Sequence, residues 1–407
     1  MNHLIIGIGA AGVTAARTLL KESEENKVTI VSEDTHVISR CMLHRYLSGE
    51  RTVESLNFIN DGLLENPRLT WIKGKTVTRL DGGSKTVYAG DEKLASADTL
   101  IIATGSNSVT PPIGELKTAK NAFGLRHLQD AINIAAAAKT AEKIAIIGAG
   151  LVGMDAAGAL VETGKKLTII DVAPTIMAIN LDDHAAEPYQ KKFEEHGCTF
   201  HLGCKVMNTQ SDGKGNITGL ELDNGKVIPC DLVIVAVGVR PATAFLEGSG
   251  LAVERAVVVN DKLETNMPGI YAAGDVAGLS GIWPNAQKQG EIAAKNISGW
   301  DMIYEDRYAM KNTVNFFGLV SLSIGSMKIE DGDEVLKQED RNVYKRLVLH
   351  DGAPAGVILQ GDIANSGFWQ HLIKNKIRID KLGKSPWKIS YADFCDTETN
   401  GEYRYKV

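Results

Sequence analysis

Residues 2–33 decide the fold, and they begin with NHLIIGIGAAG. A short apolar run, His3-Leu4-Ile5-Ile6, is followed at once by a glycine-rich turn, Gly7-Ile8-Gly9-Ala10-Ala11-Gly12. A helical pattern continues to about Lys21, and a second apolar run, Val28-Thr29-Ile30-Val31, leads to the acid that closes the stretch. A strand, a glycine turn, a helix and a second strand that ends in an acid form a βαβ unit suited to binding a dinucleotide.

Each part of this unit has a physical role in such a site. Gly7 allows the tight turn out of the strand, Gly9 lets a pyrophosphate approach the backbone, and Gly12 lets the helix pack closely on the sheet. The free N–H groups at Ala10-Ala11 and the positive end of the helix dipole then face the phosphate anion. Glu33 follows the turn by 21 residues, so its carboxylate can accept hydrogen bonds from a ribose diol.

The same unit occurs a second time. Lys143-Ile144-Ala145-Ile146-Ile147 is a predicted strand, Gly148-Ala149-Gly150-Leu151-Val152-Gly153 is the turn, and the next helix has a left-handed stop signal at Gly164. Another strand, Leu167-Thr168-Ile169-Ile170, leads to Asp171, 18 residues after the turn. Two fingerprints imply two dinucleotides, and the economical pair is a hydride donor and a tightly held flavin.

Composition limits the class of protein. The chain has 407 residues, 44% of them hydrophobic, and a net charge of −6, which argues against a nucleic-acid surface. No apolar run approaches the ~18 residues of a membrane span, and the first strand begins without a signal-type segment, so we expect a cytoplasmic protein. No metal site is expected, because no CxxC or zinc-ligand spacing joins the five cysteines: Cys41, Cys198, Cys204, Cys230 and Cys395.

The rest of the chain fits around the two units. Strands are predicted at 69–72, 75–80, 86–88, 99–103, near 198–209, at 217–222 and at 232–236, with helices at 124–139 and near 183–196. Pro111-Pro112 and the segment 237–241 mark crossings between domains, and 257–275 return to the first one. From about 306 the composition changes, and strands at 313–316, 321–326 and 344–350 with a helix at 366–374 predict a separate domain.

The predicted fold class is therefore α/β, with two Rossmann-like dinucleotide-binding domains and a C-terminal α+β domain. The expected boundaries are 1–110 with 240–305 for the first domain, 111–239 for the second, and 306–407 for the third.

The chain resembles the pyridine nucleotide–disulfide oxidoreductases, which are flavoproteins with two dinucleotides, over essentially its whole length. The resemblance rests on the two glycine turns and on three short motifs, in the family's order: Ala103-Thr104-Gly105, Ala236-Val237-Gly238 and Ala273-Gly274-Asp275. The last hundred residues are similar to the C-terminal domains of rubredoxin reductases and of the flavin part of NADH-dependent nitrite reductases. The resemblance implies FAD on the first turn and NADH on the second.

The resemblance also implies roles for single residues. Asp275 matches the aspartate that binds the flavin ribityl chain, and the segment from Ser39 through Arg40 to Arg45 matches the one that lines the isoalloxazine ring. Related reductases pair a lysine with a glutamate near flavin N5, at the positions of Arg45 and Asp155, so these two are expected to form the catalytic ion pair. His44 could relay a proton to the flavin, although a single histidine is more often structural.

Cys41 occupies the place of the reactive thiol in coenzyme A disulfide reductases, but it lacks the second cysteine of a CxxxxC pair. The expected roles of this thiol are either a buried, unreactive side chain beside the flavin or a thiolate stabilised by an arginine.

The expected function is an NADH-dependent FAD oxidoreductase that passes electrons to a redox-protein acceptor, such as rubredoxin, ferredoxin or a partner subunit. A basic set, Arg40, Arg45 and Arg51, favours an acidic ferredoxin. Three alternatives stay open: an NADH oxidase or peroxidase, a single-cysteine disulfide reductase that uses Cys41, and a non-catalytic flavin-binding subunit of a larger assembly. NADH is expected in preference to NADPH, because no basic residue follows Asp171 before Lys191. The oligomeric state is left open.

Overall fold

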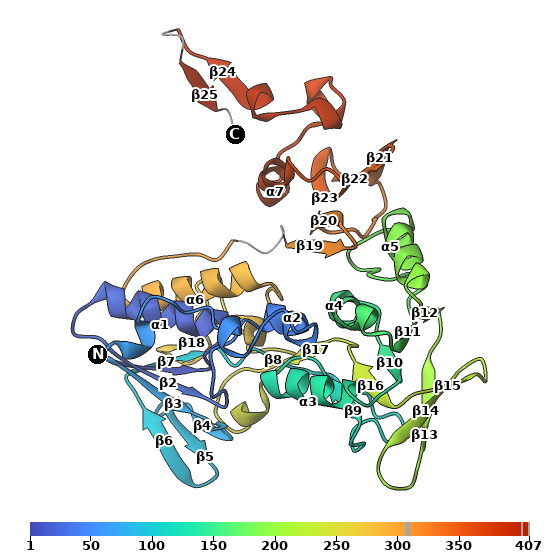
Figure 1. The fold of residues 1–407 in the computed structure, drawn as a ribbon. Helices are drawn as coiled ribbons and strands as arrows, with labels where there is room; N and C mark the ends of the chain where they lie inside the picture. Colours follow the sequence, from blue (N-terminus) through green and yellow to red (C-terminus); the bar gives the residue numbers. More distant parts are fainter. Residues whose placement is uncertain (306–309, 400–401, 406–407) are drawn as a thin grey trace. The chain divides into compact units, whose positions relative to one another are not determined.

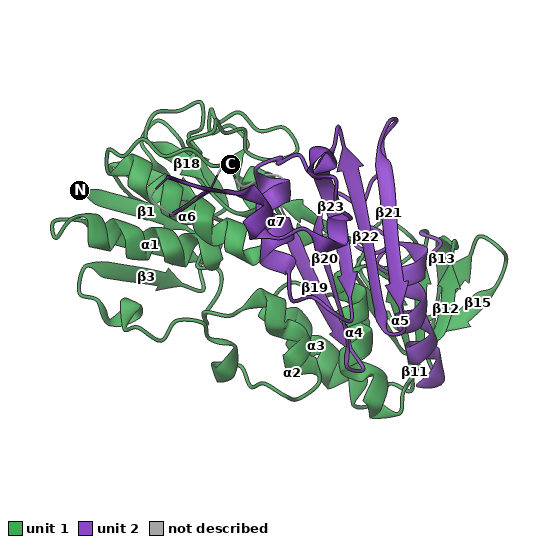
Figure 2. Ribbon diagram, turned by 90° about the horizontal axis from the view of Figure 1, so that it is seen from above, with its two compact units in different colours: residues 1–172, 198–307 green, residues 173–197, 308–407 purple. Residues whose placement is uncertain are grey.

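The computed structural model, drawn in Figure 1, describes residues 1–305, 310–399 and 402–405. The chain forms two compact units, each described by itself. Unit 1 comprises residues 1–172 and 198–307, and unit 2 comprises residues 173–197 and 308–407 (Figure 2). The division into FAD-binding, NAD-binding and C-terminal domains stays a prediction. None of the described helices is long and apolar enough to cross a bilayer.

The first sheet of unit 1 contains the predicted βαβ unit. Its five parallel strands have the order β18-β7-β1-β2-β3 and the bounds Ile270–Ala272, Thr99–Ile102, Asn2–Ile6, Lys27–Ser32 and Leu69–Lys73. Ile5 packs with the core of helices α1 (Ala10–Glu22) and α6 (Trp283–Ile297), which lie together on one face (Figure 1). Leu4 and Ile6 point to the other face. There they pack with an antiparallel sheet of β4 (Arg79–Asp81), β5 (Thr86–Ala89) and β6 (Glu92–Ser96).

The second sheet of unit 1 repeats this plan. Its parallel strands have the order β12-β11-β10-β16-β9 and the bounds Thr199–Leu202, Lys166–Asp171, Lys143–Ile147, Leu232–Val235 and Ala122–Gly124. Helices α3 (Leu128–Ala138) and α4 (Leu151–Leu160) pack against it. An antiparallel sheet of β13 (Val206–Ser211), β14 (Ile217–Leu222) and β15 (Val227–Pro229) shares its core. The two crossing segments pair as antiparallel strands β8 (Ser106–Ser108) and β17 (Val239–Pro241).

Unit 2 is built on one antiparallel sheet. Its order is β19-β20-β23-β22-β21, with the bounds Lys311–Phe316, Leu319–Gly325, Ala353–Gln360, Val343–His350 and Glu334–Asp340. Alternate residues such as Leu322 and Leu359 face helix α7 (Ser366–Lys374) in an apolar core. A short strand pair, β24 (Cys395–Thr397) and β25 (Tyr403–Tyr405), follows near the C-terminus.

The opposite face of this sheet is polar and binds helix α5 (Asp183–Glu195). The Tyr189 hydroxyl donates to the Ser321 hydroxyl at 2.8 Å, and the Gln360 amide donates to the carbonyl of Ala185, also at 2.8 Å. Phe193 packs edge-on against Phe316. The segment 173–197, which in sequence separates β11 from β12, thus completes the fold of unit 2.

The shorter elements complete the description. Helix α2 is Leu43–Leu47, and 3-10 helices lie at Arg40–Met42, Glu54–Leu56, Leu63–Glu65, Val161–Thr163, Ala244–Leu246, Asp275–Ala277, Asp380–Leu382, Pro386–Lys388 and Tyr391–Phe394.

Both βαβ units are confirmed, and three expected elements need correction. The strand expected at 75–80 is reduced to β4, because the Lys75 N–H bonds to the Ser32 carbonyl and leads the chain away from β3. The strand expected near 198–209 is two strands, β12 and β13, separated by Gly203 in the left-handed region (φ 64°). The helix expected at 124–139 begins at Leu128, because His127 caps it. Strands β21 and β23, and several short strands such as β6 and β15, are additional to those expected.

Candidate functional site

The first glycine turn has the geometry expected of a phosphate-binding turn. Gly7 has φ +107°, and a Cβ there would overlap the carbonyl oxygen of Ala103. A Cβ at Gly12 would overlap the carbonyl oxygen of Gly7, whereas one at Gly9 would meet nothing within 4 Å. Gly9 also caps α1 without any side-chain hydrogen bond, so the N–H groups of the first helical turn can bind an anion.

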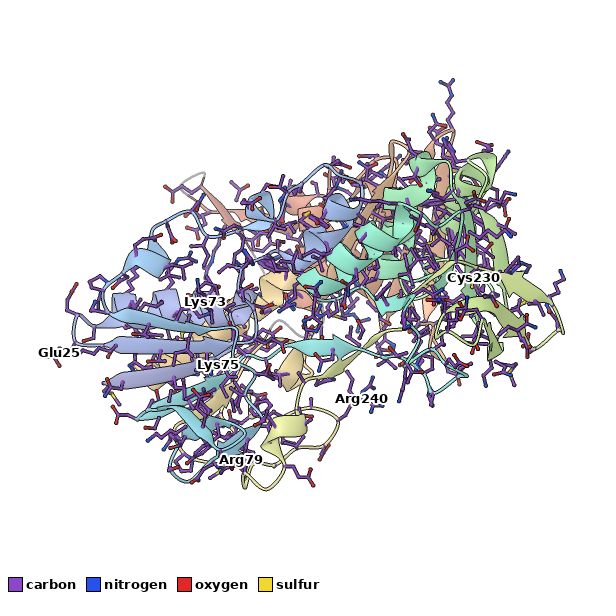
Figure 3. All side chains as sticks on the ribbon, turned by 60° about the horizontal axis from the view of Figure 1, so that its bottom comes forward. Glu25, Lys73, Lys75, Arg79, Cys230 and Arg240 are labelled. Carbon is purple, nitrogen blue, oxygen red and sulfur yellow. The ribbon has the colours of Figure 1, made fainter. Side chains whose placement is uncertain are left out.

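A cavity of about 1100 Å³ opens at this turn. It exceeds the ~300–1,000 Å³ of ordinary small-molecule pockets, which suits a dinucleotide. Most of the predicted residues of the first site line it: Gly7, Gly9, Ala10, Ala11, Glu33, Arg40, Cys41, Ala103, Thr104, Gly105, Gly274 and Asp275. Lys75 and Arg240 line it as well, and Figure 3 shows where their side chains lie in unit 1.

Asp275 is held at the cavity wall by a cation and a hydroxyl. Its carboxylate lies 2.6 Å from a guanidinium nitrogen of Arg126 and accepts a hydrogen bond of 2.7 Å from the Ser106 hydroxyl. The Arg126 Nε in turn donates to the Ser106 carbonyl at 3.1 Å. The backbone N–H of Gly274 donates to the buried Gln289 side chain at 2.7 Å. These contacts fix the carboxylate that the family resemblance assigned to the flavin.

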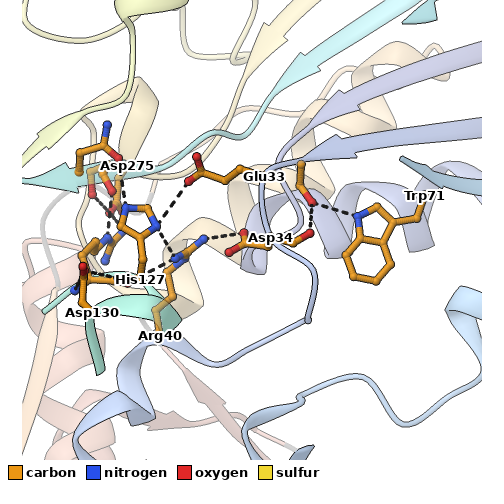
Figure 4. A network of polar contacts seen from close by, with 11 residues as sticks. Glu33, Asp34, Arg40, Trp71, His127, Asp130 and Asp275 are labelled. Carbon is orange, nitrogen blue, oxygen red and sulfur yellow. Dashed lines mark hydrogen bonds and ion pairs between the residues drawn. The ribbon is translucent and has the colours of Figure 1, made fainter. Parts of the chain in front are cut away.

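A second group of contacts lies around the acid of the first unit (Figure 4). Arg40 binds Asp34 at 2.7 Å and donates to His127 Nδ1 at 3.2 Å, and the same nitrogen lies 3.4 Å from Glu33. Burial and then the charge of Arg40 lower the pKa of His127, so its ring is neutral at pH 7. Glu33 therefore has no full cationic partner in this group, and its half-exposed carboxylate can accept hydrogen bonds from a ligand.

Arg126 and His127 are site residues that the sequence analysis missed. Both precede α3, where their N–H groups donate to Asp130 at 2.9 and 2.8 Å in a capping box. Cationic side chains are disfavoured at a helix N-terminus, where the dipole is positive. Two basic residues directly before a capped helix were therefore the signal in the sequence. They could have indicated that Arg126 and His127 bind an anion or a carboxylate.

The second glycine turn repeats the geometry of the first. Gly148 has φ +106°, and a Cβ there would overlap the Ala236 carbonyl oxygen, while Gly153 packs on the Gly148 oxygen. Gly150 has open space and caps α4 without a side-chain bond, and Leu151 and Val152 begin that helix. The neighbouring Gly238 has φ +111° and open space as well. The N–H groups at the N-terminus of α4 can therefore bind an anion in the same way.

Asp171 lies at the end of β11, beside this turn. Its carboxylate accepts a 2.5 Å hydrogen bond from the N–H of Ala149, so the acid is fixed close to the helix N-terminus. Val172, directly after it, is exposed.

Arg45 and Asp155 do not form the expected ion pair in the structure, and the catalytic role expected of the two residues stays a prediction. Arg45 is paired with Glu50, while the ion-pair partner of Asp155 in the described chain is His44, whose Nδ1 lies 3.7 Å from the carboxylate. Glu50 is only five residues from Arg45, and both are exposed, so this local pair forms without burying the guanidinium. Asp155 is partly buried, and this burial raises its pKa to about 7.

Cys41 is accessible from the cavity, as the predicted position beside a flavin requires. Burial raises the pKa of its thiol, and the opposing effect of Arg126 is smaller. The thiolate is therefore not stabilised here, which favours an unreactive thiol.

Comparison with known proteins assigns the family. The model of the pyridine nucleotide-disulphide oxidoreductases matches residues 1–290, and that of the rubredoxin NAD⁺ reductase C-terminal domain matches residues 311–377. The chain belongs to the pyridine nucleotide-disulphide oxidoreductase family. The predicted α/β fold class is thereby confirmed.

Relatives within this family include large and multisubunit enzymes. The chain is 29% identical over 390 residues to the nitrite reductase [NAD(P)H] of Bacillus subtilis, covering 94% of this chain and 48% of the relative. It is 26% identical to subunit epsilon of the NADH-dependent phenylglyoxylate dehydrogenase of Aromatoleum evansii, covering 94% of this chain and 93% of that one. The chain thus spans about half the length of some relatives and nearly all of another.

Solved structures share the fold. The ferredoxin reductase for the CYP199A2 system of Rhodopseudomonas palustris superposes with a TM-score of 0.84 at 21% identity, covering 93% of this chain and 95% of that one.

Proposed function

We propose that the chain holds FAD at the first glycine turn, oxidises NADH at the second, and passes the electrons to a small redox protein or a partner subunit. The observation that carries the proposal is the duplicated site geometry. Each of the two turns has an open central glycine, a helix N-terminus without a side-chain cap, and an acid at the end of the next strand. The match of residues 311–377 to the C-terminal domain of rubredoxin reductases supports the type of acceptor.

The chain's own residues bind and orient the two dinucleotides. In this proposal the turn residues bind the pyrophosphates, Glu33 and Asp171 accept hydrogen bonds from the adenosine riboses, and Asp275 binds the flavin ribityl chain. Bound FAD supplies the redox chemistry, because it accepts a hydride and releases electrons one at a time or in pairs. The protein supplies position, so that nicotinamide and flavin react as neighbours.

The acceptor is proposed to be external because Cys41 is unsuited to a dithiol relay. No second cysteine lies within five residues of it, and the pKa of its thiol is raised. The basic set expected to attract an acidic partner is weaker than the sequence suggested. Arg40 is neutralised by Asp34, and Arg45 by Glu50. The proposal therefore does not specify an acidic ferredoxin.

The test combines cofactor identity and electron flow. The released flavin should be FAD by mass spectrometry, because the proposal assigns Glu33 to an adenosine ribose that FMN lacks. Anaerobic NADH should bleach its absorbance, and rubredoxin, ferredoxin and ferricyanide should then restore it at rates that rank the acceptors. Release of FMN, or no bleaching by NADH, would refute the proposal.

The three alternatives are outcomes of the same experiment. Rapid reoxidation by oxygen or peroxide alone would identify an oxidase or peroxidase, and turnover with coenzyme A disulfide would identify a disulfide reductase. Bound FAD without NADH reduction would identify a non-catalytic subunit, a possibility that the relationship to a subunit epsilon keeps open. A cytoplasmic location stays part of the proposal.

A further inference from the structure

His44 and Asp155 connect the helices that follow the two sites. His44 belongs to α2, which directly follows the cavity-lining residues Arg40 and Cys41. Asp155 belongs to α4, five residues after Gly150 of the second turn. Helix α2 packs against α4, and His44 Nδ1 lies 3.7 Å from Asp155 Oδ2. The pair therefore stands between the segment that lines the first site and the helix that begins the second.

The surroundings of Asp155 favour its protonated form. Burial is the main cause, and the charge of Arg45 opposes it only in part. Cys41 is near enough for the negative charge of Asp155 to raise the pKa of its thiol. An acid in this environment changes its protonation near neutral pH, where a proton carrier is most effective.

The surroundings of His44 favour its neutral form. Burial lowers the pKa of His44, Arg45 and Arg51 lower it further, and Glu50 acts in the opposite direction. His44 Nδ1 lies 3.7 Å from the Asp155 carboxylate, a separation that one bridging water can span, so a proton can pass between the two groups. The side chains of His44 and Asp155 are 22% and 36% exposed, so the shared proton can reach solvent.

The proposed function leaves one proton to be handled. A hydride carries one proton and two electrons. When two one-electron acceptors take the electrons, NADH and two oxidised acceptors yield NAD⁺, two reduced acceptors and one proton. That proton must leave the site once for each NADH oxidised. Arg45 is unsuited to receive it, because a guanidinium does not deprotonate in proteins.

We propose that the His44–Asp155 pair receives this proton and releases it to solvent. This inference rests on the proposed function. It makes His44 the partner of Asp155, a role that the sequence analysis had given to Arg45. Asp155 is the acceptor, and His44 shares the proton at its exposed edge.

The first test follows the pair without relying on turnover. Full-length, FAD-loaded protein labelled with ¹³C at the aspartate carboxyls is titrated by NMR, and Asp155→Asn assigns the signal. The carboxyl is expected to titrate near pH 7. His44→Gln should lower this midpoint by ~0.5 unit or more, because the shared proton loses one of its two sites. Glu162→Gln, an exposed acid directly after α4, is the matched control and should leave it unchanged.

The outcomes against the proposal are equally specific. A carboxyl already ionised below pH 5, or a midpoint that moves with Arg45→Ala and not with His44→Gln, would overturn it. If His44→Gln does not bind FAD, the ¹⁵N titration of His44 in Asp155→Asn decides the same question. If His44 and Asp155 exchange a proton, the titration midpoint of His44 in Asp155→Asn should differ from its midpoint in the unmodified protein. An unchanged midpoint contradicts the proposal.

The second test asks which half of the reaction, reduction by NADH or reoxidation by the acceptor, depends on Asp155. Asp155→Asn should slow reoxidation of NADH-reduced protein by ferricyanide about tenfold near pH 7 and remove its pH inflection, because a general base typically contributes 10²–10⁴-fold and solvent can replace part of it. Reduction by NADH should stay within about twofold, since hydride transfer releases no proton. Equal reoxidation in both proteins would overturn the proposal. A failure of NADH to reduce the flavin would instead refute the proposed function, while the titration still reports on the pair.

Discussion

Arg126 and Asp275 are 149 residues apart in the sequence, and their side chains meet at 2.6 Å on the wall of the first cavity. Arg126 precedes α3, whereas Asp275 follows β18 of the other parallel sheet. The contact therefore ties together the two parallel sheets of unit 1 at the place where the family resemblance puts the flavin.

Loss of this contact should weaken flavin binding. Arg126→Gln leaves the partly buried Asp275 carboxylate without its cation, which costs ~1–3 kcal/mol. If about half of this appears as lost affinity, FAD should bind roughly 2- to 13-fold more weakly. Isothermal titration of the apoprotein with FAD measures this affinity. Arg126→Lys should recover part of the affinity that Arg126→Gln loses. Arg255→Gln, which changes an exposed arginine outside this cavity, is the control. Unchanged affinity in Arg126→Gln would show that Asp275 needs no cation.

Asp171 should make the protein prefer NADH over NADPH. Its carboxylate is fixed by the Ala149 N–H, and residues 172–176 carry no cation that could neutralise a 2′-phosphate. Lost hydrogen bonding and repulsion together should amount to roughly 2–4 kcal/mol, or about 30–1000-fold in kcat/KM. Asp171→Ala should reduce the ratio of kcat/KM with NADH to kcat/KM with NADPH. Glu142→Gln changes an exposed acid just before β10 and should leave this ratio unchanged. Equal efficiency with both nucleotides in the unmodified protein would contradict the assignment.

Cys41 should be dispensable for electron transfer. Cys41→Ser removes the sulfur with little change of shape, and NADH-dependent reduction of dyes and redox proteins should stay within about threefold, because a thiol with a raised pKa is a poor relay. Cys204→Ser provides the matched control. If Cys41→Ser loses turnover while NADH still reduces the flavin normally, the electrons pass through sulfur, and the protein is a single-cysteine disulfide reductase.

Asp155 should make stability depend on pH. Its folded-state pKa of about 7 lies above the ordinary 3.8, so the folded protein holds a proton that the unfolded chain has lost between these values. The free energy of unfolding therefore falls as the pH rises from 3.8 to about 7. Below this range both the folded and the unfolded state hold the proton, so Asp155 does not destabilise the fold. Asp155→Asn should raise the melting temperature at pH 8 more than at pH 5, whereas Glu162→Gln should change both equally. Differential scanning fluorimetry at the two pH values measures the difference.

The sequence was sufficient where the determinants are local. Both glycine turns were predictable because the need for close backbone approach falls within six residues, as the overlaps at Gly7 and Gly12 show. Arg126 was missed because its partner is 149 residues away. Glu50 was overlooked as a partner of Arg45 although it is only five residues away, because the family resemblance pointed to a more distant acid. No periodicity indicates that α5 packs in unit 2, because an amphipathic pattern identifies a buried face and not the partner that buries it.

The placement of the segment 173–197 in unit 2 restricts how this protein can be recombined. Unit 2 is continuous in space but not along the chain, so a foreign C-terminal region joined near residue 307 would leave Tyr189 and Phe193 facing a sheet that did not evolve with them. A functional chimera needs three junctions, near 172, 198 and 307, with the helix and the sheet inherited together. Because the first of these junctions directly follows Asp171, exchange of the C-terminal region cannot be separated from the loop that follows the acid expected to select NADH.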